Sequence, residues 1–168
     1  MSSIFTDNYP IIGCIHLMAL PGSPGYQGDL EEIYNRAVAE ALLLEEEGVD
    51  ALIIENFGDA PFFRQKLPPI TVACMSAIAT KISESVKLPI GINALRNDAA
   101  AALSIAVAAN ASFIRVNIHM HAMLTDQGII QGMSYETLRL RSALHAEHIM
   151  IFADINVKHA HAIVNPDL

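Results

Sequence analysis

The sequence predicts an α/β fold: a partial TIM (β/α)8 barrel of about five strand–helix units, with the C-terminal strands missing. Short apolar runs alternate with longer helical patterns, and repeated strand–helix units form parallel sheets. Each apolar run ends in a polar side chain, which is typical of a barrel with its polar groups along one rim. The 168 residues are fewer than the roughly 250 of a closed barrel, so residues 1–168 are expected to form the N-terminal part of one domain. A complete, open doubly wound sheet is the alternative.

The expected strands are organised around residues 112–119, which alternate strictly between apolar and polar side chains. Arg115, Asn117 and His119 lie on the polar side, which faces inward in a barrel. An inward arginine needs an acidic partner, for which Glu55 is expected. The other expected strands are residues 11–16, 51–55, 89–93 and 149–154.

The first two of four expected helices carry recognisable start or stop signals. Asp29 is expected to cap the first helix, with Glu32 as its capping-box partner and Gly48 at its end. Pro68 and Pro69 open the second helix, because proline is tolerated in a first helical turn. Apolar residues then recur at spacings of three and four, so each helix has one face for the core.

The last two helices are expected from residues that favour helix N-termini. Asp98 is expected to cap an alanine-rich helix, and Ser134 to cap the fourth helix. Residues 119–133 are expected to form a long loop between the fourth strand and that helix. Within it, residues 125–128 have the composition of a turn, which could also be the tip of a lid. Asn165 followed by proline is a further helix start signal.

Composition and charge narrow the functional classes. The chain is 52% apolar and 17% charged, which is ordinary for a soluble globular domain. The net charge is −8 and no Lys/Arg cluster exceeds a pair, so nucleic acid is not an expected partner. Without a signal peptide or an apolar run of about 18 residues, a cytoplasmic location is expected, and peripheral membrane association stays open. Cys14 and Cys74 lie in apolar runs and are expected to be buried free thiols.

Four residues at or just after strand ends are candidates for catalysis. A carboxylate at a barrel rim can have its pKa shifted by its surroundings and act as a general acid or base. A lysine that follows a strand fits either a Schiff-base role or a surface salt bridge. The catalytic candidates are Glu55, Asp154, His16 and Lys158.

Polar residues of the same rim are candidates for binding a small anionic ligand. Arg96 and Arg115 could hold a phosphate or carboxylate through the planar guanidinium, and a structural ion pair fits Arg115 almost equally well. Asn93 and Asn117 would orient the substrate. The remaining binding candidates are Asn56, Asn97, Asp126 and Gln127.

A divalent metal is considered and not favoured, and the cofactor stays unknown. His119 and His121 form one His-x-His pair, which supplies two ligands where a metal site needs three or four. Asp154 and His16 could complete a mixed site. One such pair is a weak signal, so no metal ligand is assigned.

Several blocks of the sequence resemble the BtpA/SgcQ family, in order and over nearly the whole chain. The most specific are Glu-Asn-Phe-Gly-Asp-Ala-Pro-Phe at residues 55–62 and Thr-Asp-Gln-Gly at residues 125–128. The other blocks are residues 13–17, 20–24, 91–93, 95–98, 113–117, 153–154 and 157–160.

The resemblance implies a barrel related to ribulose-phosphate-binding folds, from which roughly 100 residues, including the last three strands, are missing. The C-terminal strands usually bind phosphate in such barrels, so the chain could be inactive as it stands. One family member is known as a photosystem I biogenesis and stability factor, peripheral to thylakoids. Another belongs to a set of sugar-metabolism genes.

Two functions follow from these observations. The first is an enzyme of the lyase or isomerase type that acts on a small phosphorylated or sugar-like compound, although catalysis itself stays uncertain from the sequence. The alternative is a non-catalytic biogenesis or stability factor for a membrane complex such as photosystem I. In either case, the open first and fifth strands of a partial barrel are expected to make the chain a homo-oligomer.

Overall fold

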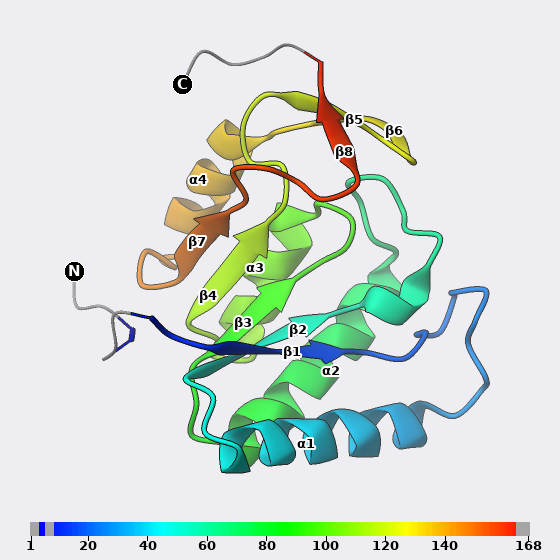
Figure 1. Ribbon diagram of the computed structural model, residues 1–168, viewed down its shortest axis with the longest axis vertical. Coiled ribbons are helices and arrows are strands. Elements are labelled where there is room, and N and C mark those ends of the chain that lie inside the picture. Colours follow the sequence, from blue (N-terminus) through cyan, green and yellow to red (C-terminus); the bar gives the residue numbers. More distant parts are fainter. Residues whose placement is uncertain (1–3, 6–8, 164–168) are drawn as a thin grey trace.

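The computed structural model describes residues 4–5 and 9–163, and its centre is a five-stranded parallel sheet (Figure 1). The order of the strands across the sheet follows their order along the chain, and every neighbouring pair is parallel. The α/β class is therefore confirmed. The five strands are β1 (Ile12–His16), β2 (Ala51–Glu55), β3 (Ile90–Asn93), β4 (Phe113–Val116) and β7 (Met150–Ala153).

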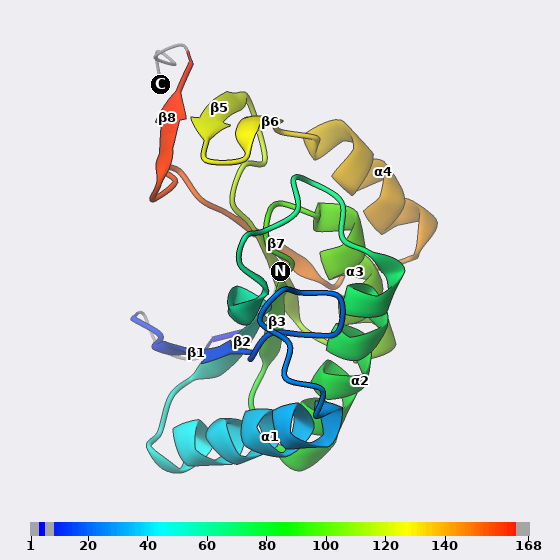
Figure 2. The ribbon, with the colours of Figure 1, turned by 90° about the vertical axis from the view of Figure 1, so that its right-hand side faces the viewer.

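The four α-helices of the described residues lie on one side of this sheet (Figure 2). A doubly wound sheet reverses its strand order and carries helices on both faces, and the described part of the chain does neither. The arrangement is compatible with part of an α/β barrel. The helices are α1 (Leu30–Glu46), α2 (Pro69–Ser85), α3 (Ala99–Ala108) and α4 (Ser134–Ala143).

The predicted cap and stop of the first helix and the proline start of the second are confirmed, whereas the hydrogen bonds of the described residues do not include the return bond from the Glu32 side chain to Asp29 that a capping box requires. The Asp29 carboxylate accepts a hydrogen bond from the Glu32 N–H at 2.9 Å and so caps α1. Gly48 follows α1 with φ +82°, a left-handed conformation that glycine adopts without a Cβ clash. Pro69 is the first residue of α2, with Pro68 before it.

The third helix starts as predicted, and the fourth does not. Asp98 Oδ1 accepts a hydrogen bond from the Ala101 N–H at 2.9 Å and caps α3. The prediction for Ser134 is wrong, because Ser134 is already the first residue of α4 and Met133 precedes it without a side-chain cap bond. The preceding strand ends at Gln131 and sets where the chain turns, so capping preference does not decide this helix start.

The main hydrophobic core lies between the helices and the sheet. Alternate strand residues point to this side, and Ile15, Ile54 and Ile92 of three adjacent strands are fully buried there. Met75 of α2 and Leu103 of α3 are buried against them. Each such side chain stabilises the fold by about 1.5–3 kcal/mol relative to an exposed one.

The opposite side of the sheet, which we call the inner face, carries a smaller apolar layer. Ala51, Ile53 and Phe113 are buried in it, and the Phe152 ring stacks on Phe113 at a centroid distance of 4.7 Å. A side chain at Gly91 would overlap the Phe113 ring, so glycine at this position leaves the space that the ring fills. The polar strand ends lie beyond this layer on the same face.

A second, antiparallel sheet lies beyond the carboxyl ends of β4 and β7 (Figure 1). The prediction of a long loop over residues 119–133 is therefore wrong, although its turn is confirmed, since Asp126 and Gln127 connect two strands of a hairpin. The middle strand also pairs with a segment more than thirty residues further along, which local sequence patterns do not reveal. The strands are β5 (Ala122–Thr125), β6 (Gly128–Gln131) and β8 (Ala160–Ala162).

The central strand is shorter than its alternating pattern predicts. β4 ends at Val116, whereas alternation continues to His119. Beyond the strand, the Ile118 N–H donates to the Asn97 side chain at 2.7 Å instead of to a neighbouring strand. Asn117 and Ile118 are nevertheless buried, so the segment continues into the interior without strand pairing.

Two further expectations concern the thiols and the tail. Cys74 is buried as predicted, whereas Cys14 is exposed because it faces the inner side of the edge strand β1. The helix start signal at Asn165 lies outside the described residues. Within the described ranges, no helix is both long enough and apolar enough to cross a bilayer.

Candidate functional site

Arg115 binds two carboxylates at the carboxyl end of the parallel sheet. Its Nη1 donates to Glu55 Oε1 at 3.0 Å, and its Nε and Nη2 donate to Asp154 Oδ1 and Oδ2 at 2.9 and 3.0 Å. The expected pairing with Glu55 is confirmed, and Asp154 is a second partner. Hydrogen bonding to Asp154 is the main cause that raises the pKa of Arg115, against the opposing effect of burial, so the guanidinium stays charged.

Two asparagines complete what we call the rim cluster: Glu55, Asn93, Arg115, Asn117 and Asp154. Asn93 lies beside Glu55 in the β2–β3 register and donates to its Oε1 at 2.9 Å. Asn117 donates to Asp154 Oδ2 at 3.0 Å. Because an ionised carboxylate only accepts hydrogen bonds, it fixes each amide with its nitrogen toward the carboxylate and its oxygen away.

His16 extends the rim cluster toward solvent. The β1–β2 register pairs His16 with Glu55, and its Nε2 lies 3.6 Å from Glu55 Oε2. Its ring stacks on Phe57 at a centroid distance of 4.4 Å. The His16 side chain is 49% exposed and that of Glu55 only 7%, so the pair joins a buried carboxylate to an accessible imidazole. Such a pair can pass a proton between a bound molecule and water.

Arg96 connects the loop after β3 to the turn of the β5–β6 hairpin. Its Nη1 donates to Asp126 Oδ1 at 2.6 Å and to Gln127 Oε1 at 2.8 Å. Its guanidinium carbon lies 5.9 Å from the centre of the Phe62 ring. Three predicted binding residues thus meet one another, and together they hold the hairpin turn against the sheet's rim.

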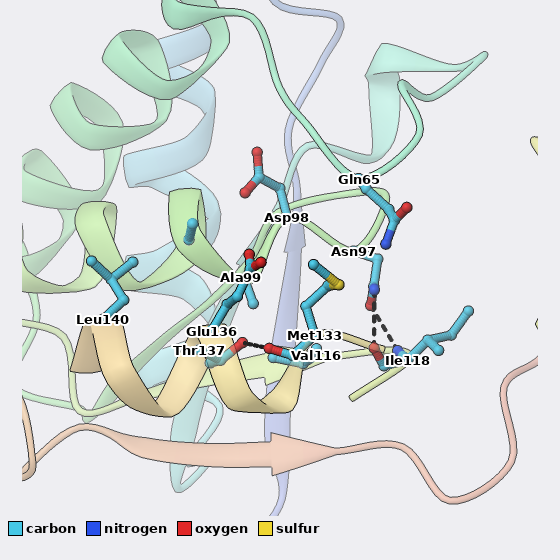
Figure 3. Close-up of a pocket in the computed structure, with 11 residues that line it drawn as sticks. Gln65, Asn97, Asp98, Ala99, Val116, Ile118, Met133, Glu136, Thr137 and Leu140 are labelled. Atoms are coloured by element: carbon cyan, nitrogen blue, oxygen red, sulfur yellow. Dashed lines mark hydrogen bonds between the residues drawn. The ribbon is translucent and has the colours of Figure 1, made fainter. Parts of the chain in front are cut away.

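Asn56 and Asn97 hold loops in place. Asn56 accepts from the Leu95 N–H at 2.7 Å and donates to the Leu95 carbonyl at 3.0 Å. Asn97, with φ +65°, makes the same two bonds to the backbone of Ile118, at 2.7 and 3.0 Å. Figure 3 shows this second pair of bonds at one side of a cavity of about 190 Å³ between α3 and α4. Loop backbone groups therefore already bond both amides, and within the described residues neither side chain makes a hydrogen bond to the rim cluster.

Lys158 is the one catalytic candidate that the fold leaves apart from the rim cluster. It is exposed in the segment between β7 and β8 and makes no hydrogen bond or ion pair with other described residues. Among residues 4–5 and 9–163, no three His, Cys, Asp or Glu side chains are grouped as a metal site would require.

The short 3-10 helix η1 (Phe57–Asp59) contributes two residues that were not among the candidates predicted from the sequence. Phe57 is the stacking partner of His16. Asp59 is buried, and its carboxylate accepts from the Leu20 N–H at 2.7 Å and from Asn56 at 3.1 Å. Burial raises the pKa of Asp59, although these two hydrogen bonds oppose the shift. An aromatic residue two positions after a strand-end carboxylate is the signal that could have pointed to the stacking.

The sequence model of the BtpA family matches residues 7–168 of this chain. A protein of Methanocaldococcus jannaschii, described as uncharacterized, is 49% identical over 93% of this chain and 59% of its own length. The photosystem I biogenesis protein BtpA of Synechocystis is 44% identical over 98% of this chain and 57% of its own length. A mitochondrial protein of Caenorhabditis elegans, also described as uncharacterized, is 32% identical over 98% of this chain and 62% of its own length. The chain thus spans about three fifths of the length of these curated relatives. It belongs to the BtpA family.

Proposed function

We propose that this chain carries the proton-transfer residues of an α/β-barrel enzyme, of the lyase or isomerase type, for a small sugar-like compound. One observation supports this most: Arg115 holds Glu55 and Asp154, from two different strands, at the carboxyl end of the sheet. That end is where barrel enzymes place their active sites. A structural ion pair needs one carboxylate, whereas two around one guanidinium leave an excess negative charge that can accept a proton from a substrate.

The roles follow from burial and access. Glu55, buried and beside His16, is the base that removes a proton from carbon, and His16 exchanges that proton with solvent. Asp154 makes two hydrogen bonds to Arg115 and is the second acid–base group. Asn93 orients the substrate from the neighbouring strand. Lys158 has no role in this proposal, because it is exposed and apart from these groups.

A substrate's anionic group, where it has one, is assigned to Arg96. Its present partner Asp126 has a side chain that is 67% exposed, so a phosphate or carboxylate can replace that partner at small cost. The hairpin turn with Gln127 would then move with the exchange and act as a cover.

We also propose that β1–β4 and β7 are the first five strands of an eight-stranded barrel. The Methanocaldococcus relative has about 260 residues, since 156 aligned residues make up 59% of it, close to the roughly 250 of a closed barrel. In the described residues β1 and β7 each have an unpaired edge. Such edges pair with other strands, so we propose that this chain made alone self-associates. Light scattering that shows a monodisperse monomer, together with a cooperative thermal transition, would contradict this.

The experiment compares this chain, and the Methanocaldococcus relative, with their Glu55→Gln variants, made in the relative at the aligned position. Each protein is incubated with a small-molecule extract of cells, and mass spectrometry follows which compounds disappear. We expect a compound consumed by the unchanged protein and untouched by the variant, with a cooperative unfolding transition that shows the variant to be folded. Equal consumption by protein and variant would remove Glu55 from the mechanism.

A second function is a non-catalytic assembly factor for a membrane complex. It is supported by the name of the Synechocystis relative and by exposed apolar residues on and beside the second sheet. These are Met120, Leu124, Ile129, Ile155 and Ile163. This function predicts that the chain sediments with membranes, that Leu124→Ser and Ile129→Ser release it, and that Glu55→Gln does not. If Glu55→Gln alone released the chain from membranes, that result would argue against an assembly-factor function.

A further inference from the structure

A cavity of about 210 Å³ lies beside the rim cluster. Asn117 and Asp154 of the rim cluster form part of its wall, and His119 adds an imidazole. The cavity lies between the segment after β4 and the segment after β7, with the second sheet around it. The rest of its lining is largely apolar and includes Ile118, Met123, Ile155 and Ala162.

Three buried polar atoms, in β3 and in the segment after β4, have no hydrogen-bond partner among the described residues. They are Oδ1 of Asn117 and Nδ1 of His119, which belong to the cavity wall, and Oδ1 of Asn93 in the neighbouring strand. Buried polar atoms in native proteins are nearly always paired, so unpaired ones at a candidate site indicate groups that a ligand completes.

The orientation of the two amides makes the Oδ1 atoms of Asn93 and Asn117 acceptors. Asn93 and Asn117 each donate through Nδ2 to a carboxylate, and turning either amide around would place its oxygen against that carboxylate. A neutral imidazole has one donor and one acceptor nitrogen, and burial lowers the pKa of His119, which favours the neutral ring. In the cavity wall, Asn117 Oδ1 therefore needs a hydrogen-bond donor, and His119 Nδ1 can accept from a hydroxyl when the ring carries its proton on Nε2.

The charges of the cavity argue against an anion in it. Asp154 lines the wall, and the Arg115 guanidinium that neutralises it already donates from Nε, Nη1 and Nη2 to the carboxylates of Asp154 and Glu55. An anion placed here would meet a carboxylate without a free cation beside it.

We propose that this cavity binds the hydroxyl-bearing, uncharged end of a ligand that has an apolar ring or chain, and that Asn117 and His119 accept its hydroxyl hydrogen bonds. This inference rests on the proposed function and names the substrate class for the same site: a polyhydroxylated compound whose anionic group, if present, lies at the Arg96 end. The free acceptors are enclosed, so the ligand reaches them when β5 or β8, which line the cavity, moves.

Four small probes with one ring size test the proposal on the full chain. The first is cis-1,2-cyclohexanediol, which has two donors, and the second is its dimethyl ether, which has none. Cyclohexyl phosphate and cyclohexylammonium carry opposite charges on the same ring. Binding is followed by NMR through the side-chain amide signals of Asn117 and the imidazole signals of His119. Dissociation constants come from the concentration dependence of these shifts.

We expect the diol to shift both sets of signals at millimolar concentration, and the ether to bind at least tenfold more weakly. His119→Phe keeps a ring but removes its nitrogen atoms, and Asn117→Leu removes the amide oxygen. Each variant should therefore bind the diol at least tenfold more weakly. In these variants the remaining member of the pair reports binding. Asn35→Leu, on an exposed face of α1, is the matched control and should change nothing.

Several results would overturn the proposal. Equal binding of the diol and the ether would show that donors are not required. Tighter binding of cyclohexyl phosphate or of cyclohexylammonium would make this an anion site or a cation site. Absence of binding by all four probes, or unchanged binding in both His119→Phe and Asn117→Leu, would also end it. Because no probe reacts, diol binding combined with full turnover by Glu55→Gln would refute the proposed function and leave this inference standing.

Discussion

Replacing Arg115 by methionine removes the guanidinium and keeps most of the side chain's length. Glu55 and Asp154 would then lie close together without the cation between them, with side-chain exposures of 7% and 16%. Removing one partner of a fully buried ion pair costs about 3–5 kcal/mol, and an exposed pair about 0–1 kcal/mol. Because the Arg115 side chain is 37% exposed, we expect a loss of about 2 kcal/mol in the free energy of unfolding.

A loss of about 2 kcal/mol corresponds to a Tm lower by roughly 4–8 °C for a chain of this size. Urea unfolding followed by circular dichroism measures the free energy, and calorimetry measures Tm. Arg36→Met, at an exposed position on α1, is the matched control and should stay within about 0.5 kcal/mol of the parent.

The sharper test of this reasoning adds Glu55→Gln and Asp154→Asn to Arg115→Met. The triple variant has no charge left in the rim cluster, and replacing a buried ion group by neutral side chains of similar volume is often close to neutral. We therefore expect it to recover at least half of the lost stability. If Arg115→Met costs less than about 0.5 kcal/mol, or if the triple variant is the less stable of the two, the charge argument is wrong.

Three further outcomes follow from the same structure. Asn97→Ala loses two hydrogen bonds to the backbone of Ile118 and places alanine at φ +65°, so it should lower the free energy of unfolding by about 2–3 kcal/mol. Asn97→Gly loses the same bonds, but glycine tolerates this φ, so its free energy of unfolding should fall by less. Gly91→Ala places a methyl group against the Phe113 ring and should cost about 1–3 kcal/mol; an unchanged unfolding midpoint would show that the inner layer is loosely packed. Burial lowers the pKa of His119 below its usual 6.5, so the imidazole binds a proton more weakly in the folded state than in the unfolded chain. The stability that the neutral ring contributes is therefore complete above pH 6.5 and is lost as the pH falls toward the pKa of the folded state. An NMR titration of His119 at or above pH 6.5 would contradict that shift, and His119→Phe should remove this part of the pH dependence.

The part of the fold that follows local rules could be predicted from the sequence. The caps at Asp29 and Asp98 and the stop at Gly48 involve residues within a few positions of one another, and all three are confirmed. The sharing of one rim by Glu55 and Asp154 was also predictable, because parallel strands bring their carboxyl ends together.

What the sequence missed depends on contacts between distant segments. β5 is a short segment that becomes a strand through pairing with both β6 and β8, and the β8 partners lie more than thirty residues away. β4 ends early because the Asn97 side chain takes the N–H of Ile118. Cys14 is exposed because β1 lies at the edge of the sheet, and an apolar run does not reveal which strand lies at an edge.

The candidate site shows the same division. Residue type and position at a strand end were enough to select Glu55, Arg115 and Asp154, which contact one another. They did not show that the side-chain amides of Asn56 and Asn97 would bond to the backbone of Leu95 and Ile118. Those bonds depend on the paths of loops that are distant in the sequence. Prediction from strand ends therefore found the charged centre and overestimated the number of free polar groups around it.

The claim on which this account depends most is that Glu55 moves a proton between carbon and solvent. Its most direct measurement is deuterium incorporation: once a compound consumed by the protein is identified, the reaction is run in D₂O and carbon-bound deuterium is read by mass spectrometry in the recovered substrate and in the product. We expect deuterium at one carbon of the recovered substrate or of the product with the unchanged protein, and none when Glu55→Gln is used under the same conditions. Turnover that leaves both compounds without deuterium, or equal labelling by Glu55→Gln, would contradict the role of Glu55.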